Sequence, residues 1–317
     1  MLCAWGLPVK LGGNIVIKLD EEAHLLLAAT ARDELSDEIV QAISQAIADH
    51  CSNKPRLTRL GDTAIEFSHL CKISGLLSLL KKQFGAFKID FNILPHADRK
   101  KKILLSDMDA TLIANECIDE LAEYANVKDQ VSAITARTMN GEVDFQQSIK
   151  ARVALLKGLP ELALCEVYEQ RIMLNPGALT LGRTMAKFGV ITGIVSGGFD
   201  YFTDRIAHRI GFGLAFANQL EIKHGKLTGV VKDPILDPIG KRTTLETLCR
   251  QEGCDLADAM CVGDGANDIM MISASGLGVA YHAKPGLEKY ATVSIKYSDL
   301  TALLYLQGYR QSEFATR

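Results

Sequence analysis

Four aspartates occur in two short segments that could place carboxylates around one site. Asp107 and Asp109 flank a single residue in Asp-Met-Asp-Ala-Thr, and Asp264 and Asp268 belong to Gly-Asp-Gly-Ala-Asn-Asp. Side chains two residues apart in an extended stretch point the same way, so Asp107 and Asp109 can face one pocket. Neighbouring carboxylates repel each other, which raises the pKa of one of them or attracts a cation. Hard oxygen ligands that leave room for water and phosphate oxygens favour Mg²⁺.

These two segments and a third, Ser196-Gly197-Gly198, each directly follow an apolar run that is typical of a buried strand. Asp, Ser and Gly are ordinary turn residues, so any one segment alone would indicate a turn. The combination indicates more, because the carboxyl ends of parallel strands meet at one edge of an open sheet, where ligands bind. The expected strands are Ile103–Ser106, Val190–Val195, Ala259–Val262 and Leu277–Ala280.

Helical segments separate these strands, and this alternation predicts a doubly wound parallel α/β sheet. The insert between the first two strands, at about 117–174, is longer than one crossover helix needs, so we expect a small helical cap there. Residues 215–231 are expected to form a hairpin with His224-Gly225 as its turn.

A second unit precedes this sheet. Pro95 and the charge run that ends at Lys102 form a linker-like segment, so we expect one unit at 1–95 and a catalytic unit at 96–317. In the first unit we expect strands at 14–18, 63–67 and 87–93 and helices at 36–50 and 74–84. This pattern favours an α+β plait of the split βαβ kind, serving as a binding or assembly module.

The segments that contain Asp107, Ser196 and Asp264, together with Lys241, resemble in order and spacing the motifs of the haloacid dehalogenase superfamily of phosphatases. The stretch 107–116, Met139-Asn140-Gly141 with Phe145, and the stretch 152–156 resemble the phosphoserine phosphatases of that superfamily. The resemblance covers about 102–298. The N-terminal unit is similar in position and length to the ACT-like domain of some members.

The resemblance implies hydrolysis of O-phospho-L-serine, the last step of serine biosynthesis, through an aspartyl-phosphate. Asp107 would be the nucleophile. Asp109 would protonate the leaving serine oxygen and then activate water. Mg²⁺ would be held by Asp107, the backbone carbonyl of Asp109 and Asp264, with Asp268 positioning these ligands.

The resemblance also assigns the groups that bind the substrate. Ser196, the Gly197 amide, Asn267 and Lys241 would contact the phosphate. Glu116 would pair with the substrate ammonium and Arg152 with its carboxylate, while Met139 and Phe145 close the apolar side of the pocket. Without the family spacing, Arg152 would be interpreted as a solvated helix residue, and Met139 and Phe145 as core residues.

Two other functions fit the same residues. A phosphotransferase that passes phosphate to an alcohol such as homoserine would use the same acid and base. An amino-acid sensor with an inactive catalytic half is the alternative from a different class, and the intact acid pair argues against it. The N-terminal unit can bind an amino-acid effector, form a homodimer or only stabilise the fold, and nothing in 1–95 decides between these roles. Cys117, beside Glu116, is interpreted as structural, because no histidine motif accompanies it.

The composition of the 317 residues sets outer limits to the function. Lys and Arg number 35 against 38 Asp and Glu, a net charge of −3 that argues against a general nucleic-acid binder. No apolar stretch approaches the ~18–20 residues of a membrane span. The 8 cysteines form no CxxC pair and lie in apolar or helical stretches, which favours buried free thiols and a cytoplasmic location.

Overall fold

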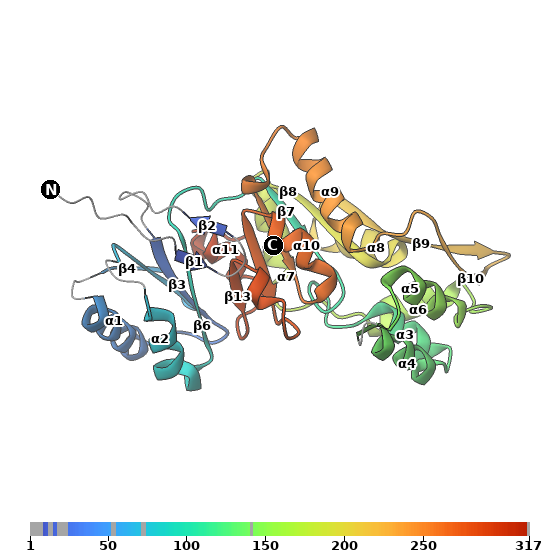
Figure 1. The fold of residues 1–317 in the computed structure, drawn as a ribbon, viewed down its shortest axis with the longest axis horizontal. Helices are drawn as coiled ribbons and strands as arrows, with labels where there is room; N and C mark the ends of the chain where they lie inside the picture. Colours follow the sequence, from blue (N-terminus) through green and yellow to red (C-terminus); the bar gives the residue numbers. More distant parts are fainter. Residues whose placement is uncertain are drawn as a thin grey trace.

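Two larger β-sheets and the helices that cover them make up the structure (Figure 1). It is a computed structural model that describes residues 9–11, 15–17, 25–51, 55–70, 74–139 and 142–315. At the start of the chain, β1 (Val9–Leu11) and β2 (Ile15–Ile17) pair as antiparallel strands. The strand predicted at 14–18 corresponds to β2.

The larger sheet has seven strands in the order β10-β9-β8-β7-β11-β12-β13. Neighbours from β9 to β13 run parallel, and β10 pairs antiparallel with β9 in the predicted hairpin. The bounds are β7 (Ile103–Ser106), β8 (Ile191–Phe199), β9 (Leu214–Lys223), β10 (Lys226–Lys232), β11 (Ala259–Gly263), β12 (Leu277–Tyr281) and β13 (Val293–Ile295). The four predicted strands are confirmed, whereas β13 has no counterpart in the sequence-based prediction.

Helices cover both faces of this sheet, as the alternating side chains of its strands require. Leu104 of β7 lies in a core that includes α7 and α8, while Leu105 lies in a second core with α9 and α10. Both leucines are fully buried. The predicted doubly wound α/β fold is therefore confirmed. The helices are α7 (Ala178–Lys187), α8 (Asp200–Ile210), α9 (Pro238–Gln251), α10 (Ile269–Ala274) and α11 (Ala302–Leu306).

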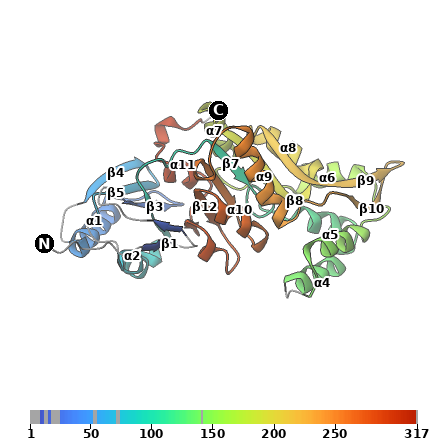
Figure 2. The ribbon, with the colours of Figure 1, turned by 45° about the horizontal axis from the view of Figure 1, so that its top comes forward.

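Four further helices lie between β7 and α7, within the insert predicted at 117–174. We call them the cap helices: α3 (Cys117–Tyr124), α4 (Lys128–Met139), α5 (Phe145–Ala154) and α6 (Leu162–Arg171). They lie beside the β9–β10 hairpin, at the end of the molecule opposite the four-stranded sheet described below (Figures 1 and 2). The hairpin supports them directly, because the Gly158 N–H donates to the Leu227 carbonyl at 2.8 Å.

The N-terminal sheet has the strand order β4-β5-β3-β6, with every neighbouring pair antiparallel. Its elements are β3 (Leu25–Ala31), α1 (Asp37–Cys51), β4 (Arg56–Gly61), β5 (Ala64–Ser68), α2 (Leu76–Phe84) and β6 (Ile89–Pro95). The order βαββαβ with β3 in the middle of the sheet is that of the predicted plait. The sequence-based prediction lacks β3 and β4.

Both faces of β3 are buried, which explains why the alternation of a half-exposed strand is missing there. Leu27 and Ala29 pack against α1 and α2, whereas Leu26 and Ala28 belong to the core of the seven-stranded sheet. In an uninterrupted apolar run such as this, hydrophobic periodicity cannot distinguish a strand from a helix. The plait and the seven-stranded sheet therefore share a hydrophobic core.

The cysteines that the structure describes agree with the prediction of buried thiols at four positions and differ from it at two. Cys51, Cys117, Cys249 and Cys261 are buried, whereas Cys254 is partly exposed. Cys165 is exposed, because it lies on the face of α6 that points away from the core. Among the described residues, no helix combines the length and apolar character needed to cross a membrane.

Candidate active site

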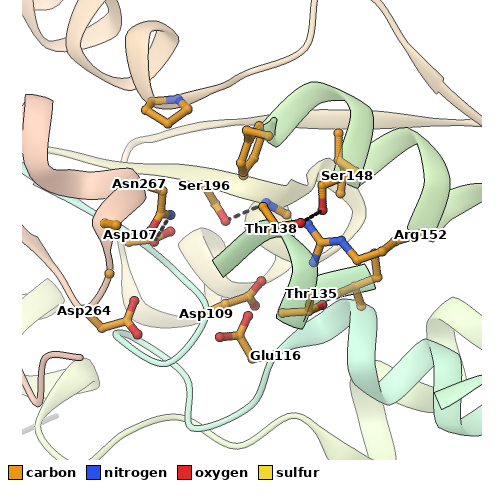
Figure 3. A pocket seen from close by; sticks show the side chains of 18 of the residues that line it. Asp107, Asp109, Glu116, Thr135, Thr138, Ser148, Arg152, Ser196, Asp264 and Asn267 are labelled. Atoms are coloured by element: carbon orange, nitrogen blue, oxygen red, sulfur yellow. Dashed lines mark hydrogen bonds between the residues drawn. The ribbon is translucent and has the colours of Figure 1, made fainter. Parts of the chain in front are cut away.

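A cavity of about 340 Å³ lies between the cap helices and the carboxyl ends of β7, β8 and β11 (Figure 3). Its lining includes most of the predicted site residues: Asp107, Asp109, Glu116, Phe145, Arg152, Ser196, Gly197, Asp264 and Asn267. Lys241 and Asp268 lie behind this lining. Lys241 contacts Asp107 of the lining and also contacts Asp268. Met139 ends α4, and its side chain lies outside the described part of the structure.

Asp107 is held rigidly at the end of β7. Its N–H donates to the Val262 carbonyl at 2.9 Å, which extends the pairing with β11 by one residue. One carboxylate oxygen accepts the Met108 N–H at 2.7 Å. The other lies 2.8 Å from Lys241 Nζ and 3.2 Å from Asn267 Nδ2. With 3% of its surface exposed, Asp107 keeps one defined orientation toward the cavity.

Lys241 is a buried cation between two carboxylates. Its Nζ lies 2.8 Å from Asp107 and 2.7 Å from Asp268, and 1% of the residue is exposed. Burial alone would lower the pKa of Lys241, but Asp107 and Asp268 outweigh it and raise the pKa. The lysine sits in the first turn of α9, whose start is fixed by Asp237 accepting the Gly240 N–H at 2.9 Å.

The environment of Asp109 favours the protonated form of its carboxyl group. Burial, followed by the charges of Glu116 and Asp107, raises the pKa of Asp109 well above its usual range. One of its oxygens accepts the Cys117 N–H at 3.3 Å, at the start of α3. Burial also raises the pKa of the Cys117 thiol well above its usual range, which disfavours the thiolate that a nucleophile needs.

Ser196 and Gly197 form the part of the cavity wall that comes from β8. The strand continues to Phe199 instead of ending before Ser196, and its register with β9 shifts between Val195 and Phe199. A Cβ on Gly197 would lie 2.8 Å from Phe145 Cζ, so glycine lets the backbone approach the cap closely. Ser196 Oγ accepts the Gly198 N–H at 3.0 Å.

Arg152 projects from α5 into the cavity from the cap side (Figure 3). Its Nε is buried and has no hydrogen-bond partner among the described residues. Burial lowers the pKa of Arg152, and the nearby charge of Glu116 acts in the opposite direction. A buried donor without a partner is costly, so this guanidinium is prepared to bind an anionic group.

The carboxylates fit a divalent cation. Oxygens of Asp107, Asp264 and Asp268 lie within 4.8 Å of one another, and all three residues are buried. Asp268 already uses one oxygen for Lys241 at 2.7 Å and the other for the Gly265 N–H at 3.2 Å. Asp107 and Asp264 line the cavity, whereas Asp268 lies behind it, so Asp107 and Asp264 are the better placed ligands. Hard carboxylate oxygens are the donors that Mg²⁺ prefers.

Among the charged residues of the cavity lining, Lys284 is absent from the sequence-based set. Lys284 follows β12, lines the cavity and contacts both Glu116 and Asp264. The rule that ligands bind at the carboxyl ends of parallel strands also applies to Leu277–Ala280, so a side chain just after that strand could have been included.

Comparison with known proteins identifies the fold and its motifs. Residues 101–276 match the family model of haloacid dehalogenase-like hydrolases. The chain belongs to this family.

Two curated relatives and one solved structure are similar to the chain. Phosphoserine phosphatase of Streptomyces coelicolor is 37% identical over 98% of this chain and 78% of its own length. Phosphoserine phosphatase of Archaeoglobus fulgidus is 42% identical over 71% of this chain, which spans 65% of that relative's length. The structure of a probable phosphoserine phosphatase from Vibrio cholerae aligns with a TM-score of 0.73 at 32% identity, over 90% of this chain and 87% of the other.

The burial of Lys241 between two carboxylates leads to a prediction about stability. Replacing Lys241 with methionine leaves two buried carboxylates without their cation, which should lower the free energy of unfolding by about 3–5 kcal/mol. Urea denaturation without added metal measures this. As a control, Lys150→Met removes a half-exposed ammonium that lies 3.7 Å from Asp233 and should leave the unfolding free energy almost unchanged. Equal effects of the two variants would contradict the account.

Proposed function

We propose that this chain is a phosphoserine phosphatase, which hydrolyses O-phospho-L-serine to L-serine and phosphate. The main support is that one cavity joins a fixed carboxylate beside a buried ammonium to a cap guanidinium whose Nε has no hydrogen-bond partner among the described residues. The first pair suits phosphoryl transfer, and the guanidinium suits a carboxylate on the substrate. The names of the relatives described above favour the same activity.

In the proposed first step, a carboxylate oxygen of Asp107 attacks phosphorus and the bond from phosphorus to the serine oxygen breaks. Asp109 gives its proton to the departing serine oxygen. In the second step, Asp109 takes a proton from water, the water oxygen bonds to phosphorus, and Asp107 is released. The raised pKa of Asp109 supports its role as the acid.

The remaining groups bind and orient the phosphate. Lys241, 2.8 Å from Asp107, presents a fixed positive charge to the phosphoryl group that Asp107 carries. Ser196, the Gly197 amide and Asn267 line the same wall and would contact phosphate oxygens. Asp107, the Asp109 carbonyl and Asp264 would hold Mg²⁺, which supplies positive charge that lets an anionic carboxylate approach an anionic phosphate.

The cap side would select the amino acid. Arg152 would bind the substrate carboxylate and Glu116 its ammonium, with Phe145 on the apolar side. Transfer of phosphate to a second alcohol such as homoserine is not favoured by the relatives, and the contact of Lys241 with Asp107 argues against an inactive sensor.

We also propose the division of the chain into a unit at 1–95 and a catalytic unit at 96–317. The end of β6 at Pro95 and the start of β7 at Ile103 support this boundary. The buried free thiols of Cys117, Cys249 and Cys261 support a reducing, cytoplasmic location. A homodimer and an amino-acid effector at the plait remain predictions.

The nucleophile is tested by Asp107→Asn. An amide cannot form the aspartyl-phosphate, so phosphate release from phosphoserine should fall by at least about 1,000-fold. A steady-state phosphate assay measures the rate, and mass spectrometry of the protein checks that the asparagine has not deamidated. Turnover near that of the parent enzyme in an intact variant would refute the mechanism.

The carboxylate site is tested by Arg152→Ala. Loss of a charge-assisted hydrogen bond should raise KM for phosphoserine by about 10–100-fold, with little change for phosphoethanolamine, which lacks the carboxylate. Arg137→Ala is the matched control, because this cap arginine is exposed and pairs with Glu142. An equal loss on both substrates would mean that Arg152 supports the fold or the phosphate instead.

A further inference from the structure

Lys284 connects two carboxylates on opposite sides of the cavity. Its Nζ lies 2.9 Å from Asp264 Oδ2 and 3.2 Å from Glu116 Oε1. Its backbone N–H also donates to the Asp264 carbonyl at 2.8 Å. Asp264 follows β11 on the sheet side, whereas Glu116 directly precedes the cap helix α3. A single ammonium therefore joins the sheet side of the site to the start of the cap.

The contact with Glu116 occupies only one of its two oxygens. Lys284 contacts Oε1, so the second oxygen can receive an ammonium group in the cavity. Without a cation at this place, Glu116 and Asp264 would repel each other, and the half-exposed Glu116 side chain could turn toward solvent. Lys284 is thus suited to keep Glu116 pointing into the cavity.

The loop that carries Lys284 is fastened to the last strand of the sheet and to the segment that follows it. The His282 N–H donates to the Ile295 carbonyl at 2.8 Å, and His282 Nε2 lies 2.9 Å from the Ser298 carbonyl. The imidazole stacks on Tyr281 with ring centroids 4.1 Å apart. His282 has a φ of 44°, in the left-handed region that a non-glycine residue adopts only when its surroundings hold it there.

The segment that holds His282 is in turn held by the plait. Asp90 on β6 accepts the N–H groups of Lys296, Tyr297 and Ser298 at 2.8, 3.1 and 2.9 Å. It also accepts the Ser298 hydroxyl at 2.8 Å. Asp90 is 5% exposed, so these four donors replace the water that an ionised carboxylate would otherwise need. The plait therefore fixes the backbone of 296–298 with a buried carboxylate.

We propose that Lys284 is a positioning residue that directs Glu116 toward the substrate ammonium, and that Asp90 of the plait sets its place through Ser298 and His282. This inference rests on the proposed function, because it concerns recognition of an amino group. It gives the N-terminal unit a role in positioning an active-site residue, through hydrogen bonds from Asp90 to Ser298 and from Ser298 to His282, and then through the backbone from His282 to Lys284.

A purely structural ion pair would behave differently. Exposed ion pairs contribute little to stability, and their loss does not alter the choice between substrates. The informative quantity is therefore the ratio of kcat/KM for phosphoserine to kcat/KM for its amine-free counterpart, 3-phosphooxypropanoate. This ratio reports on the ammonium site and is insensitive to the fraction of folded enzyme.

The first comparison is Lys284→Met against Lys284→Arg in the full chain. Methionine keeps a similar length without the charge, so the ratio should fall by about tenfold, whereas arginine should largely preserve it. An unchanged ratio in Lys284→Met would overturn the proposal. A higher ratio would also overturn it, since that would mean that Lys284 competes with the substrate ammonium.

The second comparison tests the link to the plait. Asp90→Asn cannot accept all four donors, and Ser298→Ala is a milder change that removes only the hydroxyl. Each variant should lower the ratio by about 2- to 5-fold. Neither should lower it further in the Lys284→Met background, because residues that act through the same contact do not have additive effects. Asn92→Ala is the matched control, because Asn92 lies in the same interface but bonds the backbone of Ser294 and not that of 296–298.

The outcomes separate this inference from the proposed function. A parent enzyme with no preference for phosphoserine would overturn both. Suppose instead that the parent enzyme prefers phosphoserine. The link to the plait alone is then overturned if the Asp90 and Ser298 variants keep the parent ratio, or if they lower the ratio further in the Lys284→Met background.

Discussion

A buried lysine between two aspartates is the interaction on which the rest of the site depends. Lys241 comes from the first turn of α9, Asp107 from the end of β7, and Asp268 from the loop after β11. The two carboxylates must therefore lie within 3 Å of the Lys241 ammonium. A shift of any of the three elements would leave a buried charge without its partner. The same contact orients the Asp107 carboxylate that faces the cavity, so the stability of the site and its chemistry share one set of atoms.

The charges around this lysine explain how a weakly acidic protein can bind an anion. The overall charge is −3, yet Lys241, Lys284 and Arg152 all lie at the cavity. Each has a defined place relative to the carboxylates: Lys241 between Asp107 and Asp268, Lys284 between Glu116 and Asp264, and Arg152 with a buried donor unpartnered within the described residues. Net charge describes the whole surface and says little about a cavity in which each charge is placed individually.

On the sheet side of the cavity, the structure brings together the residues that the sequence predicts to meet, because they follow the ends of strands. Asp107, Ser196 and Asp264 each lie next to a short apolar run, and the topology of parallel strands brings them together. The plait strand β3 is hidden by burial on both faces, and the three-residue β13 is too short to show a period. Lys284 is hidden for another reason: its partners Glu116 and Asp264 are 168 and 20 positions away, a proximity that only the folded chain creates.

The central claim is that one cavity combines phosphoryl transfer with recognition of both charged groups of an amino acid. Its most direct test is steady-state phosphate release from phosphoserine, phosphoethanolamine, 3-phosphooxypropanoate and a simple aryl phosphate, with Mg²⁺ and with a chelator. The account predicts the highest kcat/KM for phosphoserine, a loss of at least about tenfold when either charged group is missing, and no turnover with chelator. Similar values of kcat/KM for all four esters would contradict it.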